Sequence, residues 1–187
     1  MDWHKSLGLA MFGLVLFRLL WGFWGTWTAR FVPMMRRMRS LNSYVAKLRR
    51  RELGATFGHS PLAALSVFAL LLVLATQVTT GLFSVDVDGL ESGPLAIMIS
   101  FETGRQFAEV HEFNFNIVAA LTGLHIAAIA FYHFVLKEKL VGAMVTGRRS
   151  RTDFSEVPLP DNRPNLYMLI ATALLSGVCV VAISNFG

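Results

Sequence analysis

Four long apolar stretches, separated by charged segments, dominate the pattern of hydrophobic and polar positions along the chain. They cover about residues 7–27, 61–83, 113–136 and 166–186. Each is close to the roughly 20 apolar residues that a helix needs to cross the hydrocarbon core of a bilayer. The pattern therefore predicts an all-α integral membrane protein whose four transmembrane helices form a bundle.

The charged segments between these stretches predict how the chain lies in the membrane. Residues 30–52 hold eight basic residues and one acid, Glu52, whereas residues 84–110 hold five acids and one basic residue, Arg105. Basic residues return after the third stretch, at Lys137, Lys139, Arg148, Arg149 and Arg151. Because positively charged loops stay in the cytoplasm, we expect a multi-pass protein of the bacterial inner membrane with both termini in the periplasm.

Apolar side chains also recur at helical spacing among the arginines of residues 30–52. They are Met34, Met35, Met38, Leu41, Tyr44, Val45 and Leu48. This spacing is typical of an amphipathic helix that lies on the inner membrane surface. The alternative is a solvated basic loop that only anchors the topology.

The composition agrees with a membrane protein and excludes several other classes. Of the 187 residues, 16% are charged, against about 25% in soluble domains. The pI is about 9.9, but the basic residues flank apolar stretches, which indicates lipid headgroups rather than nucleic acid as their partner. The single cysteine excludes a disulfide framework and a C-x-x-C-H site of covalent haem attachment.

Histidines are the candidate chemistry of the apolar stretches. His111 and His125 are fourteen positions apart in the third stretch, so on a helix they face the same way, within about 40°, at depths that differ by roughly 21 Å. His4 opens the first stretch as His111 opens the third, so these two lie at the same outer level and can ligate one iron from opposite sides. The spacing suits two stacked cofactors. Taken singly, each histidine is also explained by a hydrogen bond to a neighbouring helix or by an interfacial position.

Three further residues have two possible roles each. Arg18 is fourteen positions after His4, level with His125, so it either pairs with a propionate of an inner haem or snorkels toward headgroups. His59, just before Pro61, is expected to make structural or headgroup contacts, and His133 to be an interfacial anchor beside aromatic neighbours; either can instead serve a cofactor.

The segments WHKSLG, LFRLLWGFWG, GHSPLAAL, HEFNFNIVAALTGLH and MVTGRR resemble the bacterial cytochrome b561 family, which is related to the cytochrome b subunits of nickel-iron hydrogenases. The resemblance runs from about Asp2 to Arg149. It implies a helical membrane protein with b haems that carry electrons across the bilayer. It also implies that His4 and His111 ligate an outer haem and that His125 ligates an inner haem, and Arg18 matches a recurrent arginine.

The family's first helix, whose histidine completes the inner haem, has no counterpart in this sequence. The resemblance therefore implies one to two b haems per chain, with His59 and His133 as alternatives for the missing inner ligand. We expect the natural protein to gain that ligand from an upstream span or from another subunit.

These observations predict a haem-binding transmembrane domain over residues 1–150, followed by a cytoplasmic linker and a C-terminal transmembrane helix in residues 151–187. The predicted function is electron transfer between the quinone pool and a periplasmic cytochrome c or another redox subunit, with quinone oxidoreductase as the enzymatic option. No residue is expected to be catalytic, because iron with two histidine ligands has no open position. The competing class is a non-haem membrane scaffold or a small transporter.

Overall fold

The computed structural model describes residues 2–52, 57–88, 90–137, 140–146 and 161–186. Its four long helices are α1 (Asp2–Trp24), α4 (Pro61–Phe83), α5 (Phe101–Ala130) and α7 (Leu166–Ser184). Each is long and apolar enough to span a membrane, α5 together with the π-helical segment Phe131–Val135 that continues it. The predicted all-α fold with four membrane spans is confirmed.

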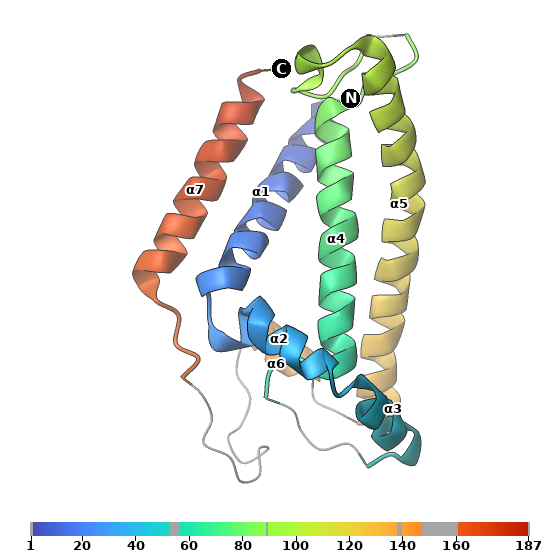
Figure 1. Cartoon of the computed structure of the whole chain (residues 1–187), viewed down its shortest axis with the longest axis vertical. Coiled ribbons are helices and arrows are strands. Elements are labelled where there is room, and N and C mark those ends of the chain that lie inside the picture. The colour runs from blue at the N-terminus through green and yellow to red at the C-terminus, as the bar shows by residue number, and fades with distance from the viewer. Residues whose placement is uncertain (1, 53–56, 89, 138–139, 147–160, 187) are drawn as a thin grey trace.

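The long helices stand side by side in the order α7, α1, α4 and α5 (Figure 1). Both ends of the described chain lie at one end of the bundle, which we call the terminal end, together with the short helix Ala96–Met98 (Figure 1). The opposite end, which we call the basic end, carries α2 (Phe31–Met38), α3 (Leu41–Arg50) and α6 (Leu140–Thr146) (Figure 1). Before α2, a single 3-10 turn covers Trp27–Ala29.

Local capping explains where the two central helices begin. Pro61 occupies the first turn of α4, where its missing N–H costs nothing, and the Ser60 side chain accepts a hydrogen bond from the Ala63 N–H. Ser100 caps α5 in the same way by accepting from the Thr103 N–H. This second cap lies well before the apolar residues of the third stretch, so α5 starts earlier than hydropathy alone predicts.

The early start of α5 corrects one expectation about His111. The sequence placed His111 at the opening of the third helix, but α5 begins at Phe101, ten positions earlier. His111 therefore lies inside a continuous helix, whose backbone holds it more firmly than a loop would. Polar residues at the start of α5 extend the helix beyond the apolar span.

The predicted amphipathic segment is helical but not continuous. It forms α2 and α3, which are separated at Arg39 and Ser40. The Tyr44 hydroxyl of α3 lies 2.9 Å from the Tyr132 hydroxyl, in the segment that continues α5. The two short helices are thus attached to the bundle rather than forming a free basic loop.

The core is thin, and most large apolar side chains face outward, as expected where lipid replaces water as the solvent. Helix α7 packs against α1, where the Trp24 indole N–H donates to the Thr172 hydroxyl over 2.9 Å. Nearer the terminal end, a Cβ at Gly13 would meet the Val180 side chain at 2.8 Å. Small residues thus let α1 and α7 approach closely.

Several predicted features lie outside the described residues. They are the boundary between residues 150 and 151, most of the linker that follows it, and the basic residues Lys139, Arg148, Arg149 and Arg151.

Candidate functional site

The structure brings His4 of α1 and His111 of α5 together at the terminal end of the bundle. Their ring centroids are 6.0 Å apart and their planes are inclined at 82°. Metal–imidazole nitrogen distances of about 2 Å imply a centroid separation of about 6 Å for two rings on opposite sides of one metal ion. The distance between these two rings therefore suits two ligands of one metal ion.

Hydrogen bonds to α4 fix the state of the His111 ring. Nδ1 lies 2.9 Å from the Gln77 carbonyl oxygen and 3.3 Å from the Thr80 hydroxyl. A ring nitrogen beside a carbonyl carries the proton and donates, so Nε2 keeps the lone pair that a metal needs. The Gln77 side-chain amide lies 3.1 Å from Nε2 and donates to that lone pair. For His111 to bind an iron through Nε2, the Gln77 amide would have to leave that nitrogen.

Asn114, which is buried, holds the Gln77 amide in place. Its side-chain N–H groups donate to Gln77 Oε1 over 2.7 Å and to the Val73 carbonyl over 2.9 Å. Gly81 completes the surface beneath the ring, since a Cβ at that position would lie 2.8 Å from His111 Cε1. The His111 ring thus rests directly on the backbone of α4.

His125 has a matching arrangement near the other end of α5. Its Nδ1 lies 3.0 Å from the Ser66 hydroxyl of α4. Ser66 and Thr80 are fourteen positions apart, as are His111 and His125. Because α4 and α5 run in opposite directions, each histidine meets one hydroxyl (Figure 1). Sequence reasoning missed these partners, although polar residues at that spacing in an apolar helix were the signal that could have found them.

Arg18 is the half-buried cation of the site. Its Cζ lies 5.4 Å from the centroid of the Phe31 ring. Nη1 is buried and has no hydrogen-bond partner among the described residues. Arg18 as a whole is half-buried, which agrees both with pairing to a cofactor and with reaching toward headgroups. A guanidinium nitrogen buried without a partner is costly, and an anionic group of a bound cofactor would satisfy it.

His59 joins α4 to the 3-10 turn at the basic end. Its Nδ1 lies 3.2 Å from the Thr28 carbonyl, and its own carbonyl accepts from Arg37 Nη1 over 3.0 Å. Burial lowers the pKa of His59, the hydrogen bond to Thr28 opposes this, and the positive charges of Arg18 and Arg37 lower the pKa further. The ring is therefore kept neutral and serves the packing of this end.

His133 lies in the π-helical segment and is exposed. Its ring is perpendicular to that of Phe134, with centroids 4.8 Å apart. In the structure, His125 hydrogen-bonds to Ser66 rather than to either His59 or His133.

The donors of this region fit a haem better than a metal site built of protein ligands alone. Among the described residues, no three His, Cys, Asp or Glu side chains gather closely enough to hold a metal ion. A metal between His4 and His111 would need a macrocycle for its other ligands. His4 and Gly8, one turn later, are both exposed, so the described part of the chain leaves this face of α1 uncovered.

A comparison with protein families relates most of the chain to known proteins. The family model described as prokaryotic cytochrome b561 matches residues 1–147. No curated protein and no solved structure matches the chain. The matched range includes α1, α4 and α5 with all five histidines. This chain, with its four membrane-spanning helices, thus belongs to the prokaryotic cytochrome b561 family and is a membrane-bound electron carrier that uses haem b.

Proposed function

We propose that the chain passes electrons between the quinone pool and a periplasmic redox partner, either a cytochrome c or another redox subunit, in the bacterial inner membrane. The observation that carries this proposal is the His4–His111 pair, whose rings come from two different helices and have centroids 6.0 Å apart. Such a pair would hold an iron and leave it no open position. Its chemistry is therefore electron transfer rather than bond making.

The residues of the chain have distinct parts in this function. Haem b supplies one-electron chemistry when bound. His4 and His111 hold it at the terminal end, and the Gln77 carbonyl orients His111 by accepting from Nδ1. This backbone hydrogen bond also keeps the His111 ring from turning.

A second haem is proposed near the basic end, held on one side by His125. Ser66 orients this ring, and Arg18 supplies a cation for a propionate. Of the histidines in this chain, His59 and His133 are the candidates for the opposing ligand. Quinone is proposed to exchange electrons at this end, with neutral His59 as a candidate hydrogen-bonding group.

A haem assay of the purified protein tests the proposal. We expect a reduced-minus-oxidised difference spectrum of b type and a pyridine haemochrome that gives one to two haems per chain. A scaffold or transporter would give no haem above background. Reduction by an added quinol, followed in the same spectrum, tests the quinone step separately.

Reporter fusions test the proposed orientation. The loop after α4, which holds Asp88, lies at the terminal end of the bundle, and α3, which ends at Arg50, lies at the basic end (Figure 1). We expect a periplasm-active reporter to be active when fused after Asp88 and silent when fused after Arg50. The reverse pattern would place the termini in the cytoplasm.

Substitution of Arg18 tests its proposed pairing with a propionate. Arg18→Leu removes charge-assisted hydrogen bonds worth about 1.5–3 kcal/mol, so haem at the basic end should be lost roughly 10- to 100-fold more easily. Haem content after dialysis against apomyoglobin measures this, with Arg39→Leu as a control that removes an exposed arginine. A variant that keeps all its haem and gains thermal stability would mean that Arg18 has no anionic partner.

A further inference from the structure

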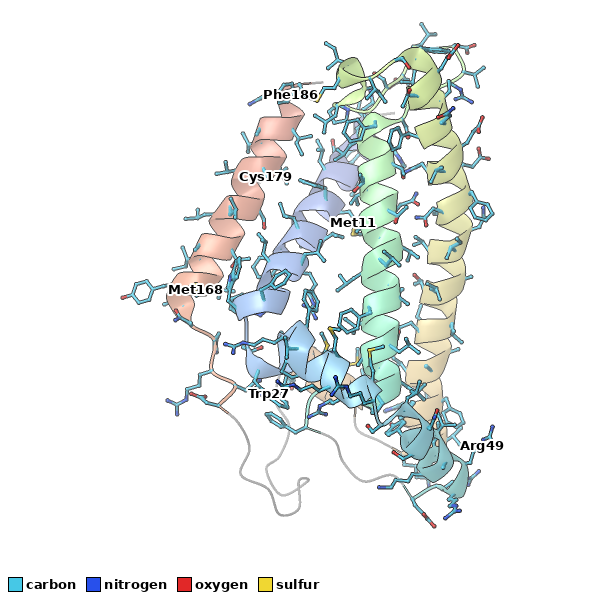
Figure 2. The ribbon with its side chains drawn as sticks, in the orientation of Figure 1. Met11, Trp27, Arg49, Met168, Cys179 and Phe186 are labelled. Carbon is cyan, nitrogen blue, oxygen red and sulfur yellow. The ribbon has the colours of Figure 1, made fainter. Side chains whose placement is uncertain are left out.

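A pocket of about 350 Å³ opens at the basic end of the bundle, lined by Trp27, Pro33, Arg36, Arg37 and Ser40. Pro33, Arg36 and Arg37 of this lining belong to α2, and Figure 2 shows Trp27 beside that helix. We propose that this pocket binds the phosphate group of an anionic phospholipid from the adjacent leaflet. The proposal uses none of the haem ligands, so it stands or falls independently of the proposed electron transfer.

Arg37 is already fixed in the orientation that such a ligand needs. Its Nη1 donates to the His59 carbonyl over 3.0 Å, and its Cζ lies 5.2 Å from the Trp27 ring centroid. A guanidinium group has five N–H donors, so the remaining ones are available to an anion. Because the side chain is held before binding, little conformational entropy is lost when a phosphate arrives.

The charge around the pocket is not balanced by the described part of the chain. The ion pair found among the described residues, Lys5–Glu91, lies at the terminal end, far from the pocket. At the basic end the described acids are Glu52 and Asp161, and neither forms an ion pair with Arg36 or Arg37. Arg36 is exposed and lines the same pocket as Arg37. Two guanidinium groups that line one pocket without a carboxylate can both donate to an oxyanion.

The apolar residues of α2 place the pocket at the depth of lipid headgroups. Met34 is buried against the bundle, whereas Val32 and Met35 are each 58% exposed although they are apolar. Helices with exposed apolar residues beside arginines lie in the membrane interface, where the phosphates of lipids are found. The Ser40 hydroxyl already donates to the Arg37 carbonyl over 2.8 Å. The two arginines therefore supply the charged donors.

Lipid titration of the detergent-solubilised, haem-loaded protein tests the proposal. Dioctanoyl phosphatidylglycerol, dioctanoyl phosphatidylcholine and inorganic phosphate are added separately, and the midpoint of thermal unfolding gives an apparent Kd. We expect phosphatidylglycerol to bind most tightly. In Arg36→Gln/Arg37→Gln its Kd should rise on the order of tenfold or more, because charge-assisted hydrogen bonds are lost.

Arg49→Gln/Arg50→Gln is the matched control, since it removes the same charge from exposed positions on α3. Its Kd should stay within about twofold of the wild type, given that screened charges outside the pocket contribute little. Equal loss in both double variants would overturn the proposal in favour of diffuse attraction. If inorganic phosphate bound as tightly as phosphatidylglycerol, the proposal that a lipid supplies the anion would be wrong.

Arg37 also supports the fold, so the single variant Arg36→Gln keeps the test decisive if Arg37→Gln unfolds. Arg36 makes no ion pair with another described residue, and its loss should leave the haem spectrum unchanged. A several-fold weaker affinity for phosphatidylglycerol in Arg36→Gln, but not in Arg49→Gln, supports the pocket. An unchanged affinity in Arg36→Gln overturns it.

Discussion

His111→Ala should remove the haem held at the terminal end, because His4 alone supplies one axial nitrogen where two are needed. The substitution also deletes the hydrogen bond of Nδ1 to the Gln77 carbonyl. Haem content, measured as pyridine haemochrome per chain, should fall by one. If the wild-type chain binds one haem, the haem content of the variant would fall to background. If the wild-type chain binds two, it would fall to half of the wild-type content.

His133→Ala is the control for this loss. His133 is exposed and contacts Phe134, so its removal should leave both the spectrum and the haem content intact. Unchanged haem stoichiometry in His111→Ala would mean that His111 is not an axial ligand. A haem lost in His133→Ala would instead identify His133 as one.

Gly81→Leu should cause loss of the same haem, although no histidine is substituted. A Cβ at position 81 would lie 2.8 Å from Cε1 and 3.1 Å from Nδ1 of His111, so a leucine must push the ring away from α4. The ring then loses the Gln77 carbonyl and its alignment with His4. We expect nearly complete loss of this haem, with about 1–3 kcal/mol of destabilisation from overpacking.

Gly81→Ala and Gly177→Leu make the result specific. The alanine variant should show partial loss or a shifted reduction potential, since a methyl group displaces the ring less. A Cβ at Gly177 of α7 meets nothing within 4 Å, so leucine there should change neither haem content nor the unfolding midpoint. A normal spectrum in Gly81→Leu would contradict the close packing of His111 on α4.

Hydropathy was sufficient to predict the four membrane spans, since an apolar stretch of that length has few alternatives to a helix across a bilayer. It did not reveal that α5 begins at Phe101. The polar first turns of this helix depend on the Ser100 cap and on contacts with the preceding loop, such as the Arg105 guanidinium group donating to the Val85 carbonyl over 2.9 Å. Contacts with the preceding loop are tertiary, so they do not appear in the sequence as a periodic pattern of apolar residues.

Helical spacing predicted the level and face of the histidines, and the structure brings His4 and His111 together. It could not identify Gln77 and Asn114 as neighbours of His111, because a single sequence does not show which face of α4 meets α5. Burial of Arg18 was one of the two alternatives that its place in an apolar stretch predicted, but the Phe31 ring beside it was not predicted, since that ring comes from a different helix. Residue spacing describes one helix at a time, whereas these contacts need two.

The packing of α7 on α1 has a consequence for how the protein is made. All five histidines lie before residue 134, and α7 begins at Leu166 and contacts mainly α1. Membrane helices insert in the order of their synthesis, and early segments fold while later ones are still being made. We infer that α1, α4 and α5 can meet, and capture haem, while α7 is still in the ribosomal tunnel. The last helix then docks on a surface of α1 that is already in place.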